Sequence, residues 1–273
     1  LPLLASSCPG WVCYAEKTHG HVLPHISTAK SPMAVMGALV KRLVAPQLGL
    51  QPGKVLHCSV MPCYDKKLEA SREDFHFDPS HGGIVCVAEG GVPEVDLVLT
   101  TGEVLELLQA RGVELPSVPP AHAVDTAFSN ADASGVLFSA EGGGAGGLIE
   151  HVYRRAAREL FGQEVPPGPL DFRTLRNSDM RELSLEVGGV KVLNFAAAYG
   201  FRNIQTLMRK IKLKKCDYHF VEVMACPSAC LNGGGQIKPG EGRTGKQLIE
   251  DLERVYHHTE VAVRAPEENE AVA

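Results

Sequence analysis

The sequence predicts an α/β protein built as two domains or as one domain with two lobes. Apolar runs alternate with segments of helical periodicity, which is the pattern of strands layered with helices. The 273 residues correspond to about two domains, at roughly 150 residues each. Apolar residues make up 44% of the chain and charged residues 22%. A sizeable core is therefore available, and long disorder, a collagen-like repeat and a coiled coil are excluded.

The elements of the first lobe, assigned to residues 1–115, follow from local patterns. A short strand is expected at Leu1–Ser6 and a helix at Trp11–His19. Ser31-Pro32 is typical of a helix N-cap followed by proline in the first turn, so Met33–Val44 is expected to be helical. The remaining elements are a buried strand at Lys54–Val60, a strand at Val95–Thr100 and a helix from Gly102 to Arg111.

A connection and a second lobe follow. Residues 116–147 are rich in Pro, Ala, Ser and Gly and show no period, so they are expected to link the lobes across the surface. The glycine run at 142–147 lacks the Lys-Ser/Thr ending of a phosphate-binding loop and is expected to form a hinge. The second lobe, 148–260, is expected to contain helices at Leu148–Phe161, Phe201–Lys214 and Gly245–His257. Its strands are expected to be a hairpin of Leu183–Val187 and Lys191–Phe195 and a single strand at Tyr218–Val223. Residues 261–273 are expected to be a frayed tail.

Charge and hydropathy limit the partners. The formal charge of −5 gives no basic excess that would indicate nucleic acid or a membrane surface as a partner. No apolar stretch reaches the ~20 residues needed to cross a bilayer. The five cations Arg209, Lys210, Lys212, Lys214 and Lys215 are expected to be a solvated helix end or a docking patch for an acidic protein.

Cysteine provides the strongest chemical signal. The eight cysteines are Cys8, Cys13, Cys58, Cys63, Cys86, Cys216, Cys226 and Cys230. The chain does not start with Met and has no secretory layout, so we interpret it as a piece of a larger protein from a reducing compartment. In such a compartment cysteines favour metal or redox chemistry over disulfides.

Three cysteine-bearing segments share one layout, an apolar strand leading into a turn with Pro or Gly. They contain Cys8, Cys63 and the pair Cys226 and Cys230. Because ligands collect at the carboxyl ends of strands in α/β sheets, the three turns can meet in one cleft. Four thiolates satisfy the ligand requirement of a [4Fe–4S] cluster, with a zinc site or buried structural thiols as alternatives. The run Gly233-Gly234-Gly235 favours the cluster, since glycine lets backbone approach a bulky inorganic core.

Two lysines follow Cys63 in the sequence. Lys66 and Lys67 are placed to offset the negative charge of a cluster bound by thiolates. For Lys67, a solvated helix start is an equally good explanation. Trp11 is expected to be a packing anchor beside the first cysteine turn.

The segments around these cysteines resemble the iron-only hydrogenase domain. They are Ser7-Cys8-Pro9-Gly10-Trp11, Met61-Pro62-Cys63-x-x-Lys66-Lys67-x-Glu69, and Met224-Ala225-Cys226-x-x-x-Cys230-x-x-Gly233-Gly234-Gly235-Gln236. Their order and wide spacing also match, and the resemblance runs from Leu1 to about His257. It is strongest to the eukaryotic iron-only hydrogenase-like proteins of cytosolic iron–sulfur protein assembly, the narfl family.

The resemblance implies a two-lobed α/β fold, with mostly parallel sheets flanked by helices and a cluster cleft between the lobes. It implies a [4Fe–4S] cluster held by Cys8, Cys63, Cys226 and Cys230, and no catalytic residue. The implied role is a non-catalytic component of the cytosolic iron–sulfur assembly (CIA) machinery, located in the cytosol, with the nucleus as a further location left open. Such a component takes clusters from an upstream cytosolic scaffold. It serves apo iron–sulfur proteins together with the CIA targeting complex, which includes a WD40 propeller subunit.

Departures from the hydrogenase pattern weigh against hydrogen chemistry. Hydrogenases have two adjacent cysteines in the first segment, the first of which shuttles protons, and Ser7 stands at that position here. A hydroxyl is a poorer proton relay than a thiol because its pKa is much higher. Pro227-Ser228-Ala229 also replaces a small, glycine-rich spacer. The alternatives kept within the family are an iron hydrogenase-type redox enzyme and a prelamin A-recognition-type binding protein.

The resemblance also implies sequence outside this chain and an insertion within it. Family members have a preceding ferredoxin-like segment and a C-terminal extension that ends in Trp. Cys86 lies at 82–93, which does not fit the family pattern and is expected to be an insertion.

Overall fold

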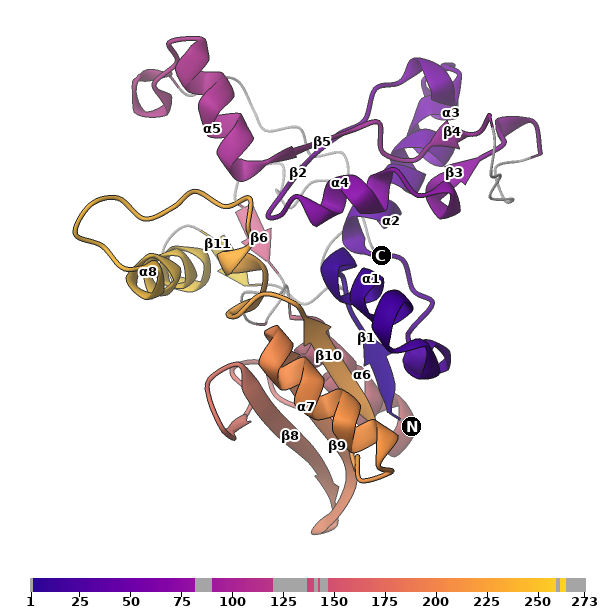
Figure 1. The fold of residues 1–273 in the computed structure, drawn as a ribbon, viewed down its shortest axis with the longest axis vertical. Coiled ribbons are helices and arrows are strands. Elements are labelled where there is room, and N and C mark those ends of the chain that lie inside the picture. The colour runs from indigo at the N-terminus through magenta and orange to yellow at the C-terminus, as the bar shows by residue number, and fades with distance from the viewer. Residues whose placement is uncertain are drawn as a thin grey trace.

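The largest element of the fold is a five-stranded sheet in the order β1-β10-β9-β8-β7. A computed structural model describes residues 2–81, 90–119, 137–139, 142, 147–258 and 261–263. The strands are β1 (Leu3–Ala5), β7 (Arg173–Thr174), β8 (Met180–Val187), β9 (Val190–Tyr199) and β10 (Phe220–Met224). β1, β10 and β9 run parallel, whereas β8 is antiparallel to both of its neighbours (Figure 1).

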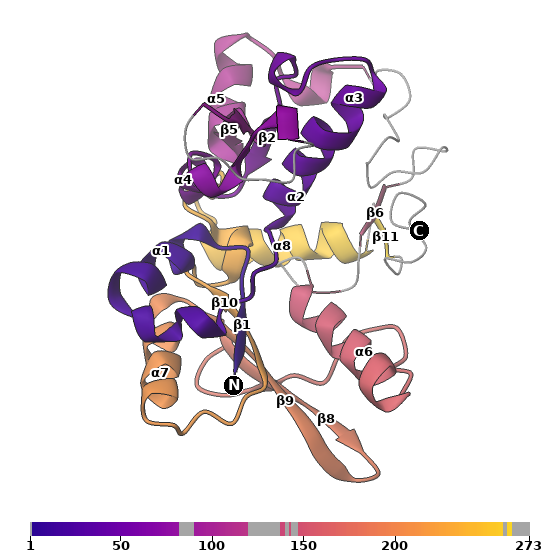
Figure 2. The ribbon, with the colours of Figure 1, turned by 90° about the vertical axis from the view of Figure 1, so that its right-hand side faces the viewer.

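Helices cover both faces of this sheet, as Figure 2 shows. They are α1 (Pro9–Thr18) and α7 (Phe201–Lys212) on one face and α6 (Leu148–Phe161) on the other. Side chains of β9 alternate between the faces: Ala196 and Ala198 pack toward α1 and α7, whereas Phe195 and Tyr199 pack toward α6. Trp11 is fully buried on the first face, which confirms it as a packing anchor.

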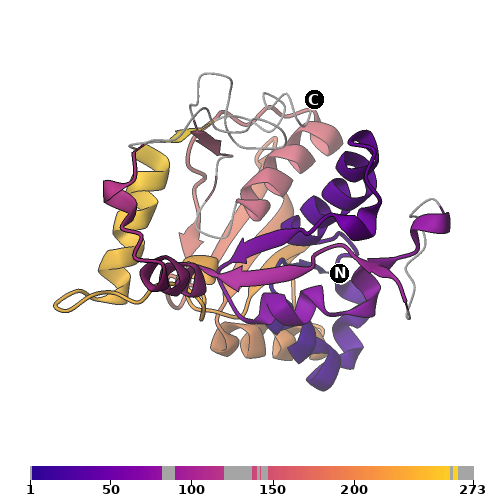
Figure 3. The same cartoon turned by 90° about the horizontal axis from the view of Figure 1, so that it is seen from above.

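A second group of elements lies above this sheet in Figures 1 and 2, and therefore nearer the viewer in Figure 3. It consists of α2 (Pro32–Leu39), α3 (Ala45–Gln47), α4 (Asp65–Ala70), α5 (Thr101–Ala110), β2 (Cys58–Met61), β3 (His76–Phe77), β4 (Val92–Pro93) and β5 (Leu97–Thr100). β2 and β5 pair in parallel, and β3 and β4 pair antiparallel. The mostly parallel α/β class expected from the sequence is therefore confirmed.

The remaining elements are short or close to the C-terminal end of the described chain. They are α8 (Gly245–His258), the parallel pair β6 (Leu137–Ser139) and β11 (Val261–Val263), the π-helical turn η2 (Val40–Val44), and the 3-10 segments η1 (Gly20–His25), η3 (Pro52–Lys54), η4 (Glu73–Phe75), η5 (Pro79–His81), η6 (Leu115–Ser117) and η7 (Ala229–Asn232). No helix in the described part of the chain is both long and apolar enough to span a membrane.

Several elements agree closely with the sequence-based expectations. α6 has the expected bounds, because its apolar stripe and the closing Gly162 are local signals. The Ser31 side chain accepts a hydrogen bond from the Ala34 N–H, which confirms it as an N-cap. The Gly188-Gly189 turn joins β8 and β9, with φ of 59° and 80° at the two glycines.

One expectation was wrong, and one expected helix differs in its form. The strand expected to be buried at Lys54–Val60 is β2, which begins only at Cys58, and Val60 is 56% exposed. Among the described residues β2 pairs with β5 alone, so its other edge has no paired strand. The helix expected over Met33–Val44 gives way to a π-helical turn after Leu39, where the buried Lys41 Nζ pairs with Asp96 at 2.7 Å.

The division into two lobes at 116–147 stays a prediction. Most of that connection, the tail from residue 264, and Cys86 lie outside the described residues. β1 pairs with β10 over Leu3–Ala5, so the N-terminal segment contributes a strand to the sheet built mainly by the second half of the chain. This pairing places the first and third cysteine turns at the same end of neighbouring parallel strands.

Candidate metal centre

Each cysteine of the predicted site follows a parallel strand. Cys8 lies between β1 and α1, as the N-cap residue of the helix. Cys63 lies between β2 and α4, and Cys226 and Cys230 follow β10, with Cys230 in η7. The Ala225 N–H donates to the Cys8 Sγ at 3.4 Å, which joins the first turn to the third.

The thiols of the three turns act on one another. Burial is the largest cause of the raised pKa of Cys63, Cys226 and Cys230. The neighbouring Cys8 raises the pKa of all three thiols further. The pKa of Cys230 reaches about 12, and Cys63 and Cys226 contribute to that rise as well. Four thiolates gathered in this way repel one another, and a cationic metal core relieves the repulsion.

The spacing of the side chains bears on which metal species fits. Among the residues that the structure describes, no three His, Cys, Asp or Glu side chains are close enough to hold a single metal ion. Zinc requires all four sulfurs at about 2.3 Å from one atom. An iron–sulfur cube is larger and takes one thiolate at each of four separate iron atoms. Four thiols match the type and number of ligands that an iron–sulfur cluster takes.

The third turn is packed tightly against the second. The Gly235 N–H donates to the Pro62 carbonyl oxygen at 2.9 Å. A Cβ on Gly233 would collide with that same oxygen, so the close approach requires glycine there. The Gly234 N–H faces Cys226 and partly offsets the raised pKa of its thiol. Two of the three glycines thus serve contact between backbones, and the middle one faces a candidate ligand.

The two lysines after Cys63 have different environments. Lys66 is buried, its Nζ pairs with Glu69 Oε2 at 2.8 Å, and its charge opposes the raised pKa of Cys63 and Cys230. Lys67 is partly exposed and pairs with Glu103 Oε1 at 2.8 Å, which ties α4 to α5. The charge-offsetting role therefore fits Lys66, and a structural role explains Lys67.

Two further charged residues lie near the thiols and were not singled out from the sequence. Asp65 contributes to the raised pKa of Cys63 and Cys226, and Lys238 opposes the rise at Cys226. The place of Asp65, two residues after Cys63, is a signal that could have identified it. Lys238 lies in the loop after η7 and carries no such signal.

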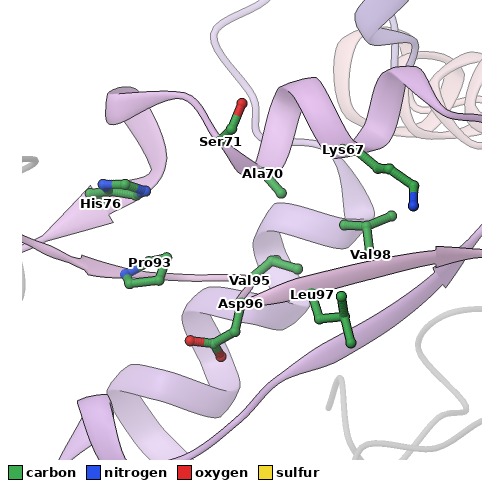
Figure 4. Close-up of a pocket in the computed structure, with 9 residues that line it drawn as sticks. All are labelled: Lys67, Ala70, Ser71, His76, Pro93, Val95, Asp96, Leu97 and Val98. Atoms are coloured by element: carbon green, nitrogen blue, oxygen red, sulfur yellow. The ribbon is translucent and has the colours of Figure 1, made fainter.

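Two cavities lie near these elements. One of about 580 Å³ borders Cys8 and Cys13 and extends to Arg72 and Phe75. The other, of about 360 Å³, lies between α4 and the 93–98 segment, with Lys67 and His76 at opposite ends (Figure 4). No cysteine lines the second cavity, so it is separate from the candidate site.

Comparison with known proteins identifies the family. The model of the iron only hydrogenase large subunit, C-terminal domain, matches residues 1–234. The chain belongs to this family. Cytosolic Fe-S cluster assembly factor narfl of Danio rerio is 50% identical over 100% of the chain, and cytosolic iron-sulfur assembly component 3 of Bos taurus is 53% identical over 98%. The chain spans 63% and 53%, respectively, of the lengths of these relatives.

The solved structures agree with the family assignment. A variant of apo [FeFe]-hydrogenase HydA1 from Chlamydomonas reinhardtii matches all of the chain and 70% of its own length, with a TM-score of 0.81 and 26% identity. The iron-only hydrogenase fold is therefore shown for this chain.

This member of the iron-only hydrogenase family differs from the hydrogenase pattern at two turns of the site. Ser7 precedes Cys8, and its Oγ lies 4.0 Å from the Met224 Sδ. Ser228 and Ala229 both have left-handed backbone, with φ of 57° and 54°, a conformation that costs non-glycine residues about 1 kcal/mol each. The Ser228 N–H donates to Asp179 Oδ1 at 2.7 Å, which helps to hold this strained turn.

Proposed function

We propose that this chain holds a [4Fe–4S] cluster through Cys8, Cys63, Cys226 and Cys230 and acts as a non-catalytic component of cytosolic iron–sulfur protein assembly. The observation that carries the proposal is the meeting of three turns that lie far apart in the sequence: the Cys8 Sγ accepts a hydrogen bond from the Ala225 N–H, and Cys8 contributes to the raised pKa of Cys63, Cys226 and Cys230. The names of the relatives, a cytosolic cluster assembly factor and a cytosolic assembly component, support the process.

Residues around the four thiols would stabilise a bound cluster by charge and by hydrogen bonds. When bound, the iron core supplies the positive charge that favours the ionised thiolates. Lys66, fixed by Glu69, balances the net negative charge on the buried side. The Cys8 Sγ accepts from the Ala225 N–H, and the Gly234 N–H faces Cys226. Hydrogen bonds to ligand sulfurs stabilise their ionised form.

Reconstitution with iron and sulfide under anaerobic conditions tests the ligand set. We expect about four iron and four sulfide per chain. Cys226→Ala or Cys230→Ala should lose most of that iron, because each removes one corner ligand. Cys13→Ala is the matched control, since Cys13 lies in α1 outside the three turns. Equal iron loss in all three variants would show that the ligand assignment is wrong.

The proposed partners and location follow from the same role. They are an upstream cytosolic cluster scaffold, the CIA targeting complex with its WD40 propeller subunit, and apo iron–sulfur proteins as clients, in the cytosol. Pull-down of the cluster-loaded chain with the WD40 subunit tests this part of the proposal. Retention that depends on the cluster is the expected result, and binding to prelamin A in place of the WD40 subunit would favour the alternative binding protein.

A hydrogenase-type redox enzyme is the second candidate, and the TM-score of 0.81 to a hydrogenase favours it. Ser7 argues against it, because a serine hydroxyl replaces the thiol expected of a proton relay. Infrared spectroscopy separates the two candidates. Bands of iron-bound carbon monoxide and cyanide would indicate a diiron centre and hydrogen chemistry, whereas their absence beside a cube-type spectrum supports the carrier.

A further inference from the structure

The first cysteine turn is joined to β10 through the side chain of Ser6. The Ser6 hydroxyl donates a hydrogen bond to the Val223 carbonyl oxygen on β10. The same Oγ accepts a hydrogen bond from the Cys8 N–H at 3.0 Å. A serine hydroxyl can do both at once, because it offers one donor and two acceptor lone pairs. Ser6 therefore connects the backbone of a candidate ligand to the neighbouring strand.

Backbone pairing between β1 and β10 stops just before this point. The last pair of the parallel register is Ala5 with Glu222. In a parallel pair, the backbone groups of a strand bond to a given neighbour at every second residue. The Val223 carbonyl and the Ala225 N–H are two residues apart beyond the last pair, and both bond to the first cysteine turn.

Side chains of the first turn supply the partners that backbone atoms would supply in a longer strand. The Ser6 hydroxyl takes the place of a backbone donor. The Cys8 Sγ, 3.4 Å from the Ala225 nitrogen, takes the place of a backbone acceptor. The same row of hydrogen bonds that pairs the strands therefore also sets the position of the Cys8 sulfur, next to the turn that carries Cys226.

The second serine of this turn does not share the bridging role. The Ser7 Oγ lies 4.0 Å from the Met224 Sδ, and among the described residues its side chain makes no hydrogen bond to the backbone. Ser6 is thus the residue whose side chain ties the first turn to the strand that leads into the third.

We propose that Ser6 is a positioning residue of the metal centre, whose hydroxyl fixes the Cys8 Sγ beside the Cys226 turn before a cluster binds. The inference rests on the proposed function and adds to it a residue that pre-organises the site. Ligands that are already held in place retain a metal better, since less conformational freedom is lost on binding. Without the hydroxyl, the Val223 carbonyl oxygen and the Cys8 N–H lose their partner, and the first turn is free to move.

Hydrogen exchange in the chain without metal tests the geometry directly. Ser6→Ala removes both hydrogen bonds, so we expect the amide protons of Cys8 and Ala225 to exchange about fivefold faster or more. The amide proton of Val221, in the paired part of β10, should exchange at the rate of the unaltered chain. Nuclear magnetic resonance resolves these amides individually.

Reconstitution with iron and sulfide tests the effect on the cluster. Ser6→Ala keeps all four thiols and should take up about four iron per chain. It should release that iron to excess EDTA about threefold to tenfold faster than the unaltered chain. The electron paramagnetic resonance g-values of its reduced cluster should also shift, because one ligand sulfur is no longer held in the same position.

A second pair of variants isolates the hydroxyl. Ser6→Thr and Ser6→Val have nearly the same shape, and only threonine keeps the hydroxyl. The cavity of about 580 Å³ that Ser6 borders offers room for the larger side chains. Ser6→Thr should restore the exchange rates, the iron release and the g-values, whereas Ser6→Val should behave like Ser6→Ala. This comparison also serves if Ser6→Ala folds poorly.

Ser184→Ala is the matched control. Ser184 is also partly buried, and its hydroxyl donates to Asn194 Oδ1 at 3.0 Å between β8 and β9, away from the cysteine turns. Its loss should cost comparable stability and leave iron release and g-values unchanged. An equal change in Ser184→Ala would overturn the inference, because the effect of Ser6 would then reflect stability alone.

The outcomes separate this inference from the proposed function. An unaltered chain that binds four iron, while Ser6→Ala releases it at the same rate, would overturn the inference and leave the proposed function standing. If the unaltered chain takes up no iron, the proposed function fails, and the inference fails with it even where amide exchange is faster.

Discussion

Glu222 is a buried carboxylic acid whose ionisation destabilises the folded chain. It lies on β10, is fully buried, and accepts a hydrogen bond from the Tyr199 hydroxyl at 3.1 Å, while its Oε1 has no hydrogen-bond partner in the described structure. Burial, followed by the charge of Glu150, raises the pKa of Glu222 to about 7. The ionised carboxylate is therefore unfavourable in the folded protein at neutral pH.

The pH dependence of stability should reveal this residue. Its pKa is higher in the folded chain than the ordinary value of 4.5, so the folded state binds the proton more tightly. The stability that this group contributes is present below about pH 4.5 and is lost as pH rises through 7. The free energy of unfolding of Glu222→Gln, measured relative to that of the unaltered chain, should therefore rise by about 2 kcal/mol as the pH increases from 5 to 8.

Urea denaturation at several pH values measures this difference. Glu164→Gln is the control, because Glu164 is exposed and its removal should not change the slope with pH. A difference between Glu222→Gln and the unaltered chain that stays constant from pH 5 to pH 8 would contradict the assignment.

At the scale of elements, the turns depend on caps and close backbone contacts. Thr100 and Glu103 form a capping box at the start of α5. The Gly102 N–H donates to the Gly235 carbonyl oxygen at 2.9 Å, and Gly235 in turn donates to Pro62. The loop after η7 is thereby joined to both β–α turns of the β2–β5 pair. The third cysteine turn keeps its position because the backbone of two other turns holds it.

Replacing one glycine of this loop should loosen that contact. A Cβ at Gly233 would meet the Pro62 carbonyl oxygen and force the backbones apart, whereas a Cβ at Gly234 meets nothing within 4 Å. We expect Gly233→Ala to lose about 1–3 kcal/mol in free energy of unfolding and Gly234→Ala to lose less than half of that. Thermal or urea unfolding of the two variants provides the comparison, and equal losses would show that the contact does not matter.

At the scale of the whole molecule, the candidate ligands join two separate sheets. Cys8, Cys226 and Cys230 follow strands of the five-stranded sheet, and Cys63 follows β2 of the two-stranded β2–β5 sheet. A cluster held by all four would be a covalent link between the two parts. Metal sites of this kind contribute directly to folding stability, since the unfolded chain does not present the same ligands together.

Removal of the cluster should therefore destabilise the whole chain. We expect chelation of the reconstituted protein to lower the Tm by about 5 °C or more and to speed limited proteolysis between the two parts. Cys226→Ala protein, treated identically, should show no change on chelation because it holds little iron. A Tm that does not respond to chelation in the unaltered chain would mean that the four thiols do not join the two sheets.

Local sequence determined the elements whose signals lie within a few residues of one another. The apolar stripe of α6, the N-cap at Ser31 and the hairpin around Gly188-Gly189 all belong to this class. The positions of the candidate cysteines, each in a turn after a strand, could be predicted for the same reason. The role of those cysteines as cluster ligands stays a prediction.

Tertiary structure decided what depends on contacts between distant segments. β1 pairs with β10 although most of the chain separates them, and β2, which was expected to be buried, is partly exposed. Lys66 and Lys67 are adjacent in the sequence, yet Lys66 is buried beside the thiols and Lys67 forms an ion pair with Glu103 of α5. The Asp65 carboxylate lies against Gly10 and near Ala225, which are distant from it in the sequence. Periodicity and caps report forces within one segment, whereas burial and charge at the site arise from segments that only folding brings together.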